Sequence, residues 1–402
     1  MSIVNTQRLY YEQGALSETT ARIVAIGGGP GRPVVAVDRT IFFPGGGGQP
    51  GDLGRLAGIA VSGVAESGGL ILHELSSPLP EGLEVGSEVR LAIDADRRRE
   101  YAERHTGQHL VSAAFLRVAG AATRSVHHGP EFSTIDFASP GLDDETLSAC
   151  EEEANRIIAD DYRVITHLCP PERLDSFSLR RVPPVGEATI RVVEIDGYDY
   201  TPCCGVHAPN TSYLRLAKIT GAERYKGLTR ISFVTGGRAI ANYKQIFGKA
   251  AAAAKALGVS MEGIDGESSR LLARCKELEA GRAALLREWS GREADLAIGA
   301  ASSGAPRFVF ARRGFSERSL AESTARAIAS RGSIGMVASE RDLTVHAAAP
   351  DPSAALGALL APVARECGGR GGGGPTLFRV SFGEKENFDI FIQKSSIILS
   401  KL

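Results

Sequence analysis

The sequence is poor in cysteine, tryptophan and net charge. Its 402 residues include six cysteines and one tryptophan, and 46 basic residues nearly balance 47 acidic ones, for a formal net charge of −1. Six dispersed cysteines do not form a disulfide framework, so we expect a reducing compartment. The near-neutral charge argues against binding of nucleic acid over the whole surface. A nucleic-acid partner would need a local basic surface.

Long hydrophobic runs and targeting signals are also lacking. The first residues, Met1–Thr6, do not show the basic-then-apolar pattern of a signal peptide. No apolar run approaches the ~20 residues of a membrane-spanning helix. We therefore expect a cytoplasmic protein without a membrane partner. The run Gly45–Gly51 lacks the GxxxxGK[ST] ending of a nucleotide-binding loop, so we expect no ATP site there.

The length and the pattern of the chain predict an α+β multidomain fold. Residues 1–93 hold short β-rich runs between glycines and prolines, which indicate a small barrel or sandwich, and we assign a barrel-like domain. Residues 94–238 mix helix and strand and predict an α+β domain. Residues 239–300 predict two helices, and residues 301–402 predict a small α/β domain that includes a glycine-rich run.

The helical segment has a pattern of its own. Apolar residues recur at alternating spacings of four and three, interrupted by Arg282: Leu271, Cys275, Leu278, Leu285 and Trp289. Such spacing is typical of a coiled coil and would suit a homodimer formed through this segment. An amphipathic helical hairpin packed on its own chain explains the pattern equally well.

Two pairs of residues with metal-binding side chains stand far apart in the sequence. His105 and His109 lie in a helix predicted to begin near Asp94, and their spacing of four places both imidazoles on one face. Cys203 and His207 repeat this spacing in a loop after a strand. Such nitrogen and sulfur ligands suit Zn²⁺ better than Mg²⁺ or Ca²⁺, which prefer oxygen. We predict that the four residues bind one zinc ion per chain.

The order of several motifs gives the sequence a family resemblance. The segments His105–His109 and Cys203–His207 resemble the HxxxH and CxxxH motifs of the editing domain that alanyl-tRNA synthetases share with the free-standing AlaX proteins. Further matching segments occur in the expected order: Ile41–Gly51, His127–Gly129, Ser133–Asp136 and the glycine-rich run Gly368–Pro375. The chain is most similar to the long form of AlaX. Only Gly383–Leu402 departs from the family pattern.

The resemblance implies a hydrolase that proofreads translation. It would hydrolyse, in trans and without ATP, the ester of serine wrongly attached to alanine tRNA, with glycine as the alternative amino acid. A pocket that accepts alanine cannot strongly reject either one, because one such group changes binding only about 10- to 200-fold. A candidate basic surface for tRNA lies in residues 215–249, where one acid, Glu223, accompanies Arg215, Lys218, Arg224, Lys226, Arg230, Arg238, Lys244 and Lys249.

The resemblance also implies roles for site residues. The zinc ligands His105, His109, Cys203 and His207 would form the catalytic centre. Either all four would bind and close a tetrahedron, or His207 would yield and leave an open place. The residues expected to bind the substrate are His127, Thr134, Gln49, Gly47 and Gly48. The implied C-terminal domain is of the DHHA1 type, although the Asp-His-His motif of phosphoesterases is absent from the sequence.

Two other functions remain open on the same motifs. The protein could be an editing hydrolase for another tRNA, because a zinc site does not name the tRNA. It could also be a zinc-stabilised tRNA-binding protein without turnover. A zinc peptidase is disfavoured because the histidine pair lacks the glutamate of HExxH; Thr106 occupies that position.

Overall fold

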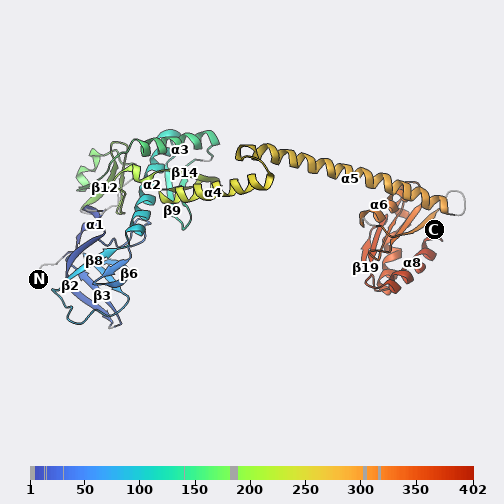
Figure 1. The fold of residues 1–402 in the computed structure, drawn as a ribbon, viewed down its shortest axis with the longest axis horizontal. Coiled ribbons are helices and arrows are strands. Elements are labelled where there is room, and N and C mark those ends of the chain that lie inside the picture. Colours follow the sequence, from blue (N-terminus) through green and yellow to red (C-terminus); the bar gives the residue numbers. More distant parts are fainter. Residues whose placement is uncertain are drawn as a thin grey trace. The chain divides into compact units, whose positions relative to one another are not determined.

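A computed structural model describes residues 5–12, 14, 16–29, 31–139, 141–181, 189–301, 306–315 and 318–402. The chain divides into two compact units, Met1–Ala252 and Ala253–Leu402 (Figure 1). Several sheets combine with helices, which confirms the predicted α+β multidomain class. The four predicted domain ranges are not tested by this division and stay predictions. Every described helix is too short or too polar to span a bilayer.

The first unit begins with a closed β-barrel, as predicted. Its strand order is β2-β3-β7-β6-β5-β8. Buried and exposed residues alternate along much of these strands, so that Ile23, Val35, Leu56 and Leu91 share one core. A small sheet of β1 and β4 and the short helix α1 accompany the barrel. The elements are β1 (Gln7–Arg8), α1 (Leu9–Glu12), β2 (Glu18–Gly29), β3 (Arg32–Val37), β4 (Arg39–Thr40), β5 (Gly54–Leu56), β6 (Ile59–Ser67), β7 (Leu70–Leu75) and β8 (Glu88–Ile93).

The helix α2 (Ala95–Ala119) leads from the barrel into the second part of this unit. Asp94 caps it by accepting a hydrogen bond from the Arg97 backbone N–H, and Gly120 ends it at φ 63°. Together with α3, it shares a core with a sheet of order β14-β15-β10-β9; a second sheet has the order β11-β12-β13. The elements are β9 (Thr123–His128), β10 (Ser133–Phe137), α3 (Asp144–Ala159), β11 (Val164–Cys169), β12 (Ile190–Ile195), β13 (Asp199–Pro202), β14 (Ala217–Tyr225), β15 (Leu228–Thr235) and α4 (Gly237–Leu257).

The middle of α2 is buried although it is polar. Arg98 forms an ion pair with Asp52 of the barrel side, with Nε 3.0 Å from Oδ1. Glu103 accepts hydrogen bonds from Arg215 and from the backbone N–H of Gly237, each at 2.9 Å. Because buried charges are costly unless they are paired, these contacts fix α2 on both sides. The turn that carries residues 105–109 is therefore held in place.

The second unit contains a mixed sheet of order β16-β17-β18-β20-β19 with several helices, an α/β arrangement as predicted. The glycine-rich run supplies the edge strand β19. Residues 383–402, which depart from the family pattern, contain α8, and Phe388 and Phe391 of this helix are buried in the core. The elements are α5 (Ile264–Ala300), β16 (Phe308–Arg313), α6 (Arg318–Ala329), β17 (Ile334–Ser339), β18 (Thr344–Ala348), α7 (Leu356–Glu366), β19 (Arg370–Gly373), β20 (Leu377–Ser381) and α8 (Lys385–Leu399).

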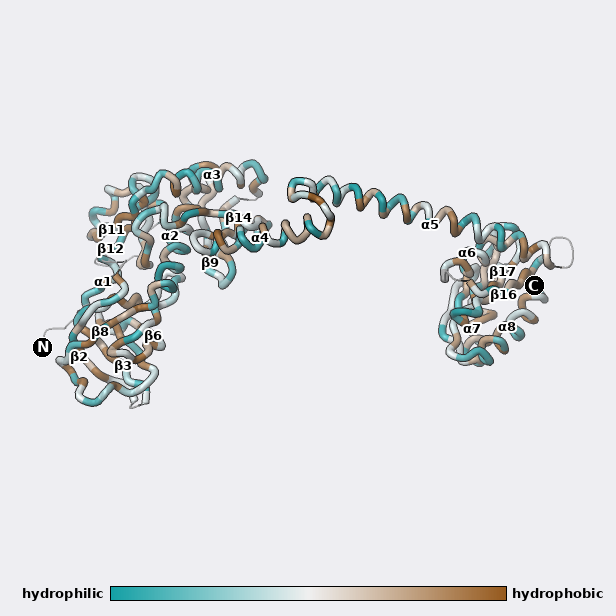
Figure 2. The backbone as a smooth tube through the Cα atoms, viewed as in Figure 1, coloured by the Kyte–Doolittle hydropathy of each residue, from teal (hydrophilic) through white to brown (hydrophobic). Residues whose placement is uncertain are grey.

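The two helices predicted in the linker are present as α4 and α5. Hydrophobic positions recur along α5 (Figure 2), and Leu278, Leu285 and Trp289 are 56%, 67% and 51% exposed. The structure contains one chain and gives the predicted homodimer no support. The dimer therefore stays a prediction.

Candidate metal centre

The fold brings the two distant ligand pairs together. His105 and His109 project from α2, Cys203 and His207 lie in the loop after β13, and their ligand atoms all lie within 4.8 Å of one another. Sγ of Cys203 is 3.2 Å from Nε2 of His105 and 3.5 Å from Nε2 of His207. A tetrahedral zinc site with usual bond lengths places neighbouring N and S ligands about 3.5 Å apart. The cluster therefore has the size and the donor set for one metal ion.

Hydrogen bonds orient the imidazoles of this cluster. Oε1 of Gln49 accepts from Nδ1 of His105 and from the backbone N–H of Val206, both at 3.0 Å. Oγ1 of Thr106 lies 3.1 Å from Nδ1 of His207. These contacts leave Nε2 of both rings facing Cys203, an outer-shell arrangement typical of histidine ligands. Nδ1 of His109 is buried and has no hydrogen-bond partner among the described residues. A bound ion would supply a partner for this ring.

Burial keeps the histidines of the cluster neutral. It lowers the pKa of His105 to about 4, with a further contribution from the positive charge of Arg191. It also places the pKa values of His109 and His207 well below the ordinary value. Burial raises the pKa of the Cys203 thiol, so the thiolate would need a nearby cation. Neutral imidazole and thiolate are the forms that bind zinc, and the cluster fits such an ion.

A cavity of about 220 Å³ opens onto the cluster. Its wall includes the apolar side chains of Val126 and Ile190 and the polar side chains of Gln108 and Arg181. Pockets for drug-sized ligands usually exceed about 300 Å³. The smaller size suits a compact acyl group.

The glycine-rich turn lies beside this cavity. The φ angles of Gly45, Gly46, Gly47 and Gly48 are 92°, 145°, 59° and 83°, values that other residues adopt rarely. Gly47 lines the cavity, and a Cβ added to it would lie 3.4 Å from Sγ of Cys204. The turn also positions Gln49 against His105. A contact of Gly47, Gly48 or Gln49 with a substrate stays a prediction.

Gly205 allows the loop of residues 203–207, here called the ligand loop, to approach α2 closely. A Cβ at this position would lie 2.2 Å from Cε1 of His105 and 2.9 Å from Oε1 of Gln49. No side chain fits into this space without displacing the ring of His105. The loop can therefore reach the helix only with glycine here.

Two residues predicted to bind substrate lie away from the cavity wall. His127 is exposed on β9, and Thr134 is its partner on β10. The wall of the 220 Å³ cavity includes neither of them. The next residue, His128, faces the cluster instead, with its ring centroid 5.7 Å from that of His105. The roles of His127 and Thr134 stay predictions.

Sequence reasoning did not single out Gln108 or Arg191. Gln108 is buried and lines the cavity three positions after His105, so the shared helix face was a usable signal. Arg191 lies on β12 and donates hydrogen bonds to the backbone of the ligand loop. No sequence motif marked it, because these contacts depend on the tertiary fold.

Comparison with known proteins finds relatives of this chain among alanyl-tRNA editing proteins. Residues 190–232 match the family described as threonyl and alanyl tRNA synthetase second additional domain. The alanyl-tRNA editing protein AlaX-L of Pyrococcus horikoshii is 32% identical over 249 residues, which cover 60% of this chain and 60% of the relative. The chain is similar to the alanyl-tRNA editing proteins of the AlaX type. This confirms the resemblance inferred from the motifs.

Other relatives agree with this AlaX-type relationship. The alanyl-tRNA editing protein Aarsd1 of Mus musculus is 35% identical over 210 residues, 51% of this chain and 50% of the relative. An alanine–tRNA ligase of Pyrococcus abyssi is 34% identical over 255 residues, 60% of this chain and 27% of the relative. The chain thus spans less than two thirds of each of these relatives. The family match contains the loop with Cys203 and His207, half of the candidate ligand set.

Proposed function

We propose that this AlaX-type chain hydrolyses the ester that joins serine to alanine tRNA, with a zinc ion bound in the His/Cys cluster. The observation that carries the proposal is the convergence of His105, His109, Cys203 and His207 within 4.8 Å beside a small cavity. The names of the relatives, alanyl-tRNA editing proteins, support the substrate class. Glycine is the second candidate amino acid, since it is smaller than serine.

The four ligands would hold zinc, which acts as a Lewis acid on an ester carbonyl and favours the ionisation of water near neutral pH. The protein's own side chains prepare the site for this chemistry. Gln49 accepts a hydrogen bond from Nδ1 of His105, so Nε2 of this ring already faces the cluster and needs no reorganisation when an ester binds.

The number of firm ligands decides whether the ester can reach the ion. Three protein ligands leave one position open, whereas four close the tetrahedron. We propose that His207 is the ligand that yields. His105 and His109 are buried, whereas His207 is half-buried.

A polar group in the cavity would meet the serine hydroxyl. Gln108 lines the cavity, and its Nε2 donates a hydrogen bond to Oγ of Ser112 at 2.9 Å. This bond orients the amide and leaves Oε1 as an acceptor at its other end. We therefore propose Gln108 for this contact in addition to the predicted His127 and Thr134.

The exposed face of α4 is proposed as part of the tRNA surface. Half of the eight predicted basic residues form ion pairs with acids of the same unit: Arg215 with Glu103, Lys218 with Glu151, Arg230 with Asp136 and Arg238 with Glu100. Lys244 and Lys249 are exposed on α4 beside Tyr243 and Phe247, a combination suited to phosphates and bases. Replacing both lysines with alanine should weaken tRNA binding at low salt; Lys218→Ala should weaken it less.

A deacylation assay tests the proposed function. Alanine tRNA charged with serine, glycine or alanine, and threonine tRNA charged with serine, are the substrates. We expect release of serine from alanine tRNA and little release of alanine. Faster release from threonine tRNA would favour an editing hydrolase for that tRNA. Absence of release by the parent, with unfolding of His105→Ala, would favour a non-catalytic zinc-stabilised tRNA-binding protein.

A further inference from the structure

Two side chains hold three consecutive carbonyl groups of the ligand loop. Nη1 of Arg191 donates hydrogen bonds to the carbonyl oxygens of Cys203 and Gly205, at 2.8 and 2.7 Å. The hydroxyl of Tyr11 donates to the carbonyl oxygen of Cys204 at 3.0 Å. The backbone of this loop, which carries Cys203 and His207, is thus fixed by residues that are not candidate ligands.

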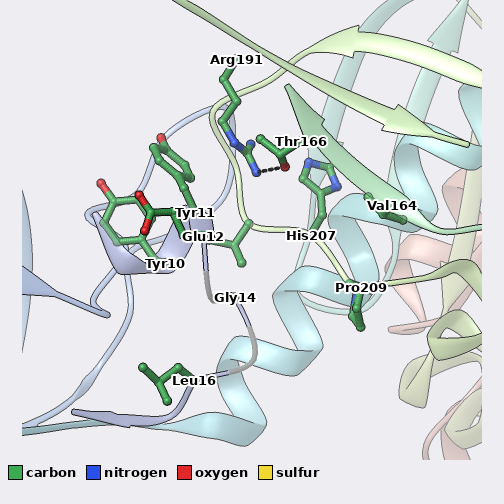
Figure 3. Close-up of a pocket in the computed structure, with 12 residues that line it drawn as sticks. Tyr10, Tyr11, Glu12, Gly14, Leu16, Val164, Thr166, Arg191, His207 and Pro209 are labelled. Carbon is green, nitrogen blue, oxygen red and sulfur yellow. Dashed lines mark hydrogen bonds between the residues drawn. The ribbon is translucent and has the colours of Figure 1, made fainter. Parts of the chain in front are cut away.

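The same two side chains also fix each other. The guanidinium of Arg191 lies over the ring of Tyr11, 4.5 Å from its centroid, and its Nη2 donates to Oγ1 of Thr166 at 3.1 Å. Figure 3 shows Arg191 between Tyr11 and Thr166. All three side chains line a second cavity of about 540 Å³, and His207 lines it as well. Arg191 therefore has one defined orientation, from which both carbonyl contacts follow.

The contacts of Arg191 and Tyr11 with the ligand loop join separate parts of the first unit. Tyr11 belongs to α1, next to the barrel, whereas Arg191 belongs to β12. The adjacent Tyr10 packs with Phe43 and with Val206 of the ligand loop. Gln49 contacts the same loop at the backbone N–H of Val206. The barrel side thus holds the loop at two places, and the sheet of β12 holds it at a third.

We propose that Arg191, supported by Tyr11, is a positioning residue that sets the distance of Cys203 and His207 from the histidines of α2. The proposal rests on the metal binding proposed above. A guanidinium presents its donors in a rigid plane, so one nitrogen can hold two carbonyls while another holds Thr166. A lysine has a single nitrogen on a flexible stem and cannot reproduce all three contacts. Outer-shell residues of this kind typically change metal affinity 10- to 100-fold.

Metal affinity and the Co²⁺ spectrum of the full chain test this role. Zn²⁺ affinity is measured by competition with a chromophoric chelator, and the Co²⁺ charge-transfer and d–d bands report the thiolate bond and the ligand geometry. For Arg191→Met we expect about 10- to 100-fold weaker Zn²⁺ binding and altered d–d bands. For Tyr11→Phe, which loses one hydrogen bond, we expect about 2- to 10-fold weaker binding. Arg191→Lys should fall between the parent and Arg191→Met.

A matched control is available in the same unit. Arg117 lies over the ring of Tyr198, 4.3 Å from its centroid, and donates to the carbonyl oxygen of Tyr198 at 2.6 Å. Arg117→Met removes a comparable arginine–tyrosine contact that does not involve the ligand loop. We expect the parent's Zn²⁺ affinity and Co²⁺ spectrum for this variant.

The outcomes separate this role from the proposed function. If the parent binds neither Zn²⁺ nor Co²⁺, the proposed metal centre fails, and the positioning role is overturned with it. If the parent binds both ions while Arg191→Met and Tyr11→Phe keep its affinity and spectrum, only the positioning role is overturned. Tyr11→Phe removes a single oxygen, so it decides the question even if Arg191→Met does not fold.

Discussion

Gln49 and His105 are 56 positions apart in the sequence, yet Oε1 of the amide accepts a hydrogen bond from Nδ1 of the imidazole at 3.0 Å. The same oxygen accepts from the backbone N–H of Val206 at 3.0 Å. One side chain of the glycine-rich turn thus holds a candidate ligand on α2 and the loop that carries two more. It links the barrel to both halves of the candidate metal centre.

Replacing Gln49 with leucine should weaken zinc binding about 10- to 100-fold, because Nδ1 of His105 and the N–H of Val206 lose their acceptor. Chelator competition measures the change. Asn155→Leu is the matched control: its side-chain amide donates to and accepts from the backbone of Ala217, at 2.8 and 2.9 Å. Equal zinc affinities for the two variants would contradict the role of Gln49.

Gly205→Ala should abolish metal binding while the rest of the unit stays folded. The added methyl group would lie 2.2 Å from Cε1 of His105, so the loop must move away from α2. Metal analysis of the purified variant and far-UV circular dichroism check this expectation. Gly221→Ala is the control, because nothing lies within 4 Å of a Cβ at that position. One metal ion per chain in Gly205→Ala would show that the loop packs differently.

Gln108→Leu should change which amino acid is released more than the total activity. The substitution keeps a side chain of similar length but removes the acceptor proposed for the serine hydroxyl. We expect kcat/KM for the serine ester to fall about 10-fold relative to the glycine ester, as for loss of one neutral hydrogen bond. An equal fall in kcat/KM for both esters would indicate that Gln108 contributes to the packing of α2 and does not contact the serine hydroxyl.

The barrel should lose stability in mildly acidic solution because of His73. In this buried ring, Nδ1 lies 3.0 Å from the carbonyl oxygen of Val35, and Nε2 lies 2.9 Å from Oγ1 of Thr40. Burial lowers the pKa of His73 to about 4. The unfolded chain therefore takes up this proton first, at its ordinary pKa of about 6.5. Stability is lost as the pH falls from about 6.5 to about 4, at up to about 1.4 kcal/mol per pH unit.

Hydrogen exchange of the barrel amides measures this dependence. The His73→Gln variant cannot take up this proton. Its barrel should therefore lose less stability between pH 6.5 and pH 4, by about the contribution of one proton to the free energy of unfolding. An identical pH dependence in the parent and the variant would contradict the assignment to His73.

The sequence was sufficient to predict the features that follow from local patterns. Short β-rich runs indicated the barrel, and the spacing of His105 and His109 indicated a shared helix face. The pairing of these histidines with Cys203 and His207 followed from the chemistry of the donors. Motif order indicated the family. These inferences need only the periodicity of a helix or a strand and the preferences of a metal.

Features that depend on register or on distant contacts were out of reach. His127 and His128 are neighbours on one strand, so they face opposite sides, and the sequence does not say which side faces the cluster. The basic segment looked uniformly available for RNA, although Arg215 is paired with Glu103 across 112 positions. The two carbonyl contacts of Arg191 likewise exist only after β12 and the ligand loop have come together.

We expect hydrolysis of the mischarged ester to require one metal ion in the His/Cys cluster. The most direct measurement is the single-turnover rate of serine release from alanine tRNA on one preparation, depleted of metal with a chelator and then titrated with Zn²⁺. We expect the rate to fall on depletion, to rise linearly with added zinc, and to reach its plateau at one ion per chain. An undiminished rate in metal-free protein would contradict this requirement for a metal ion.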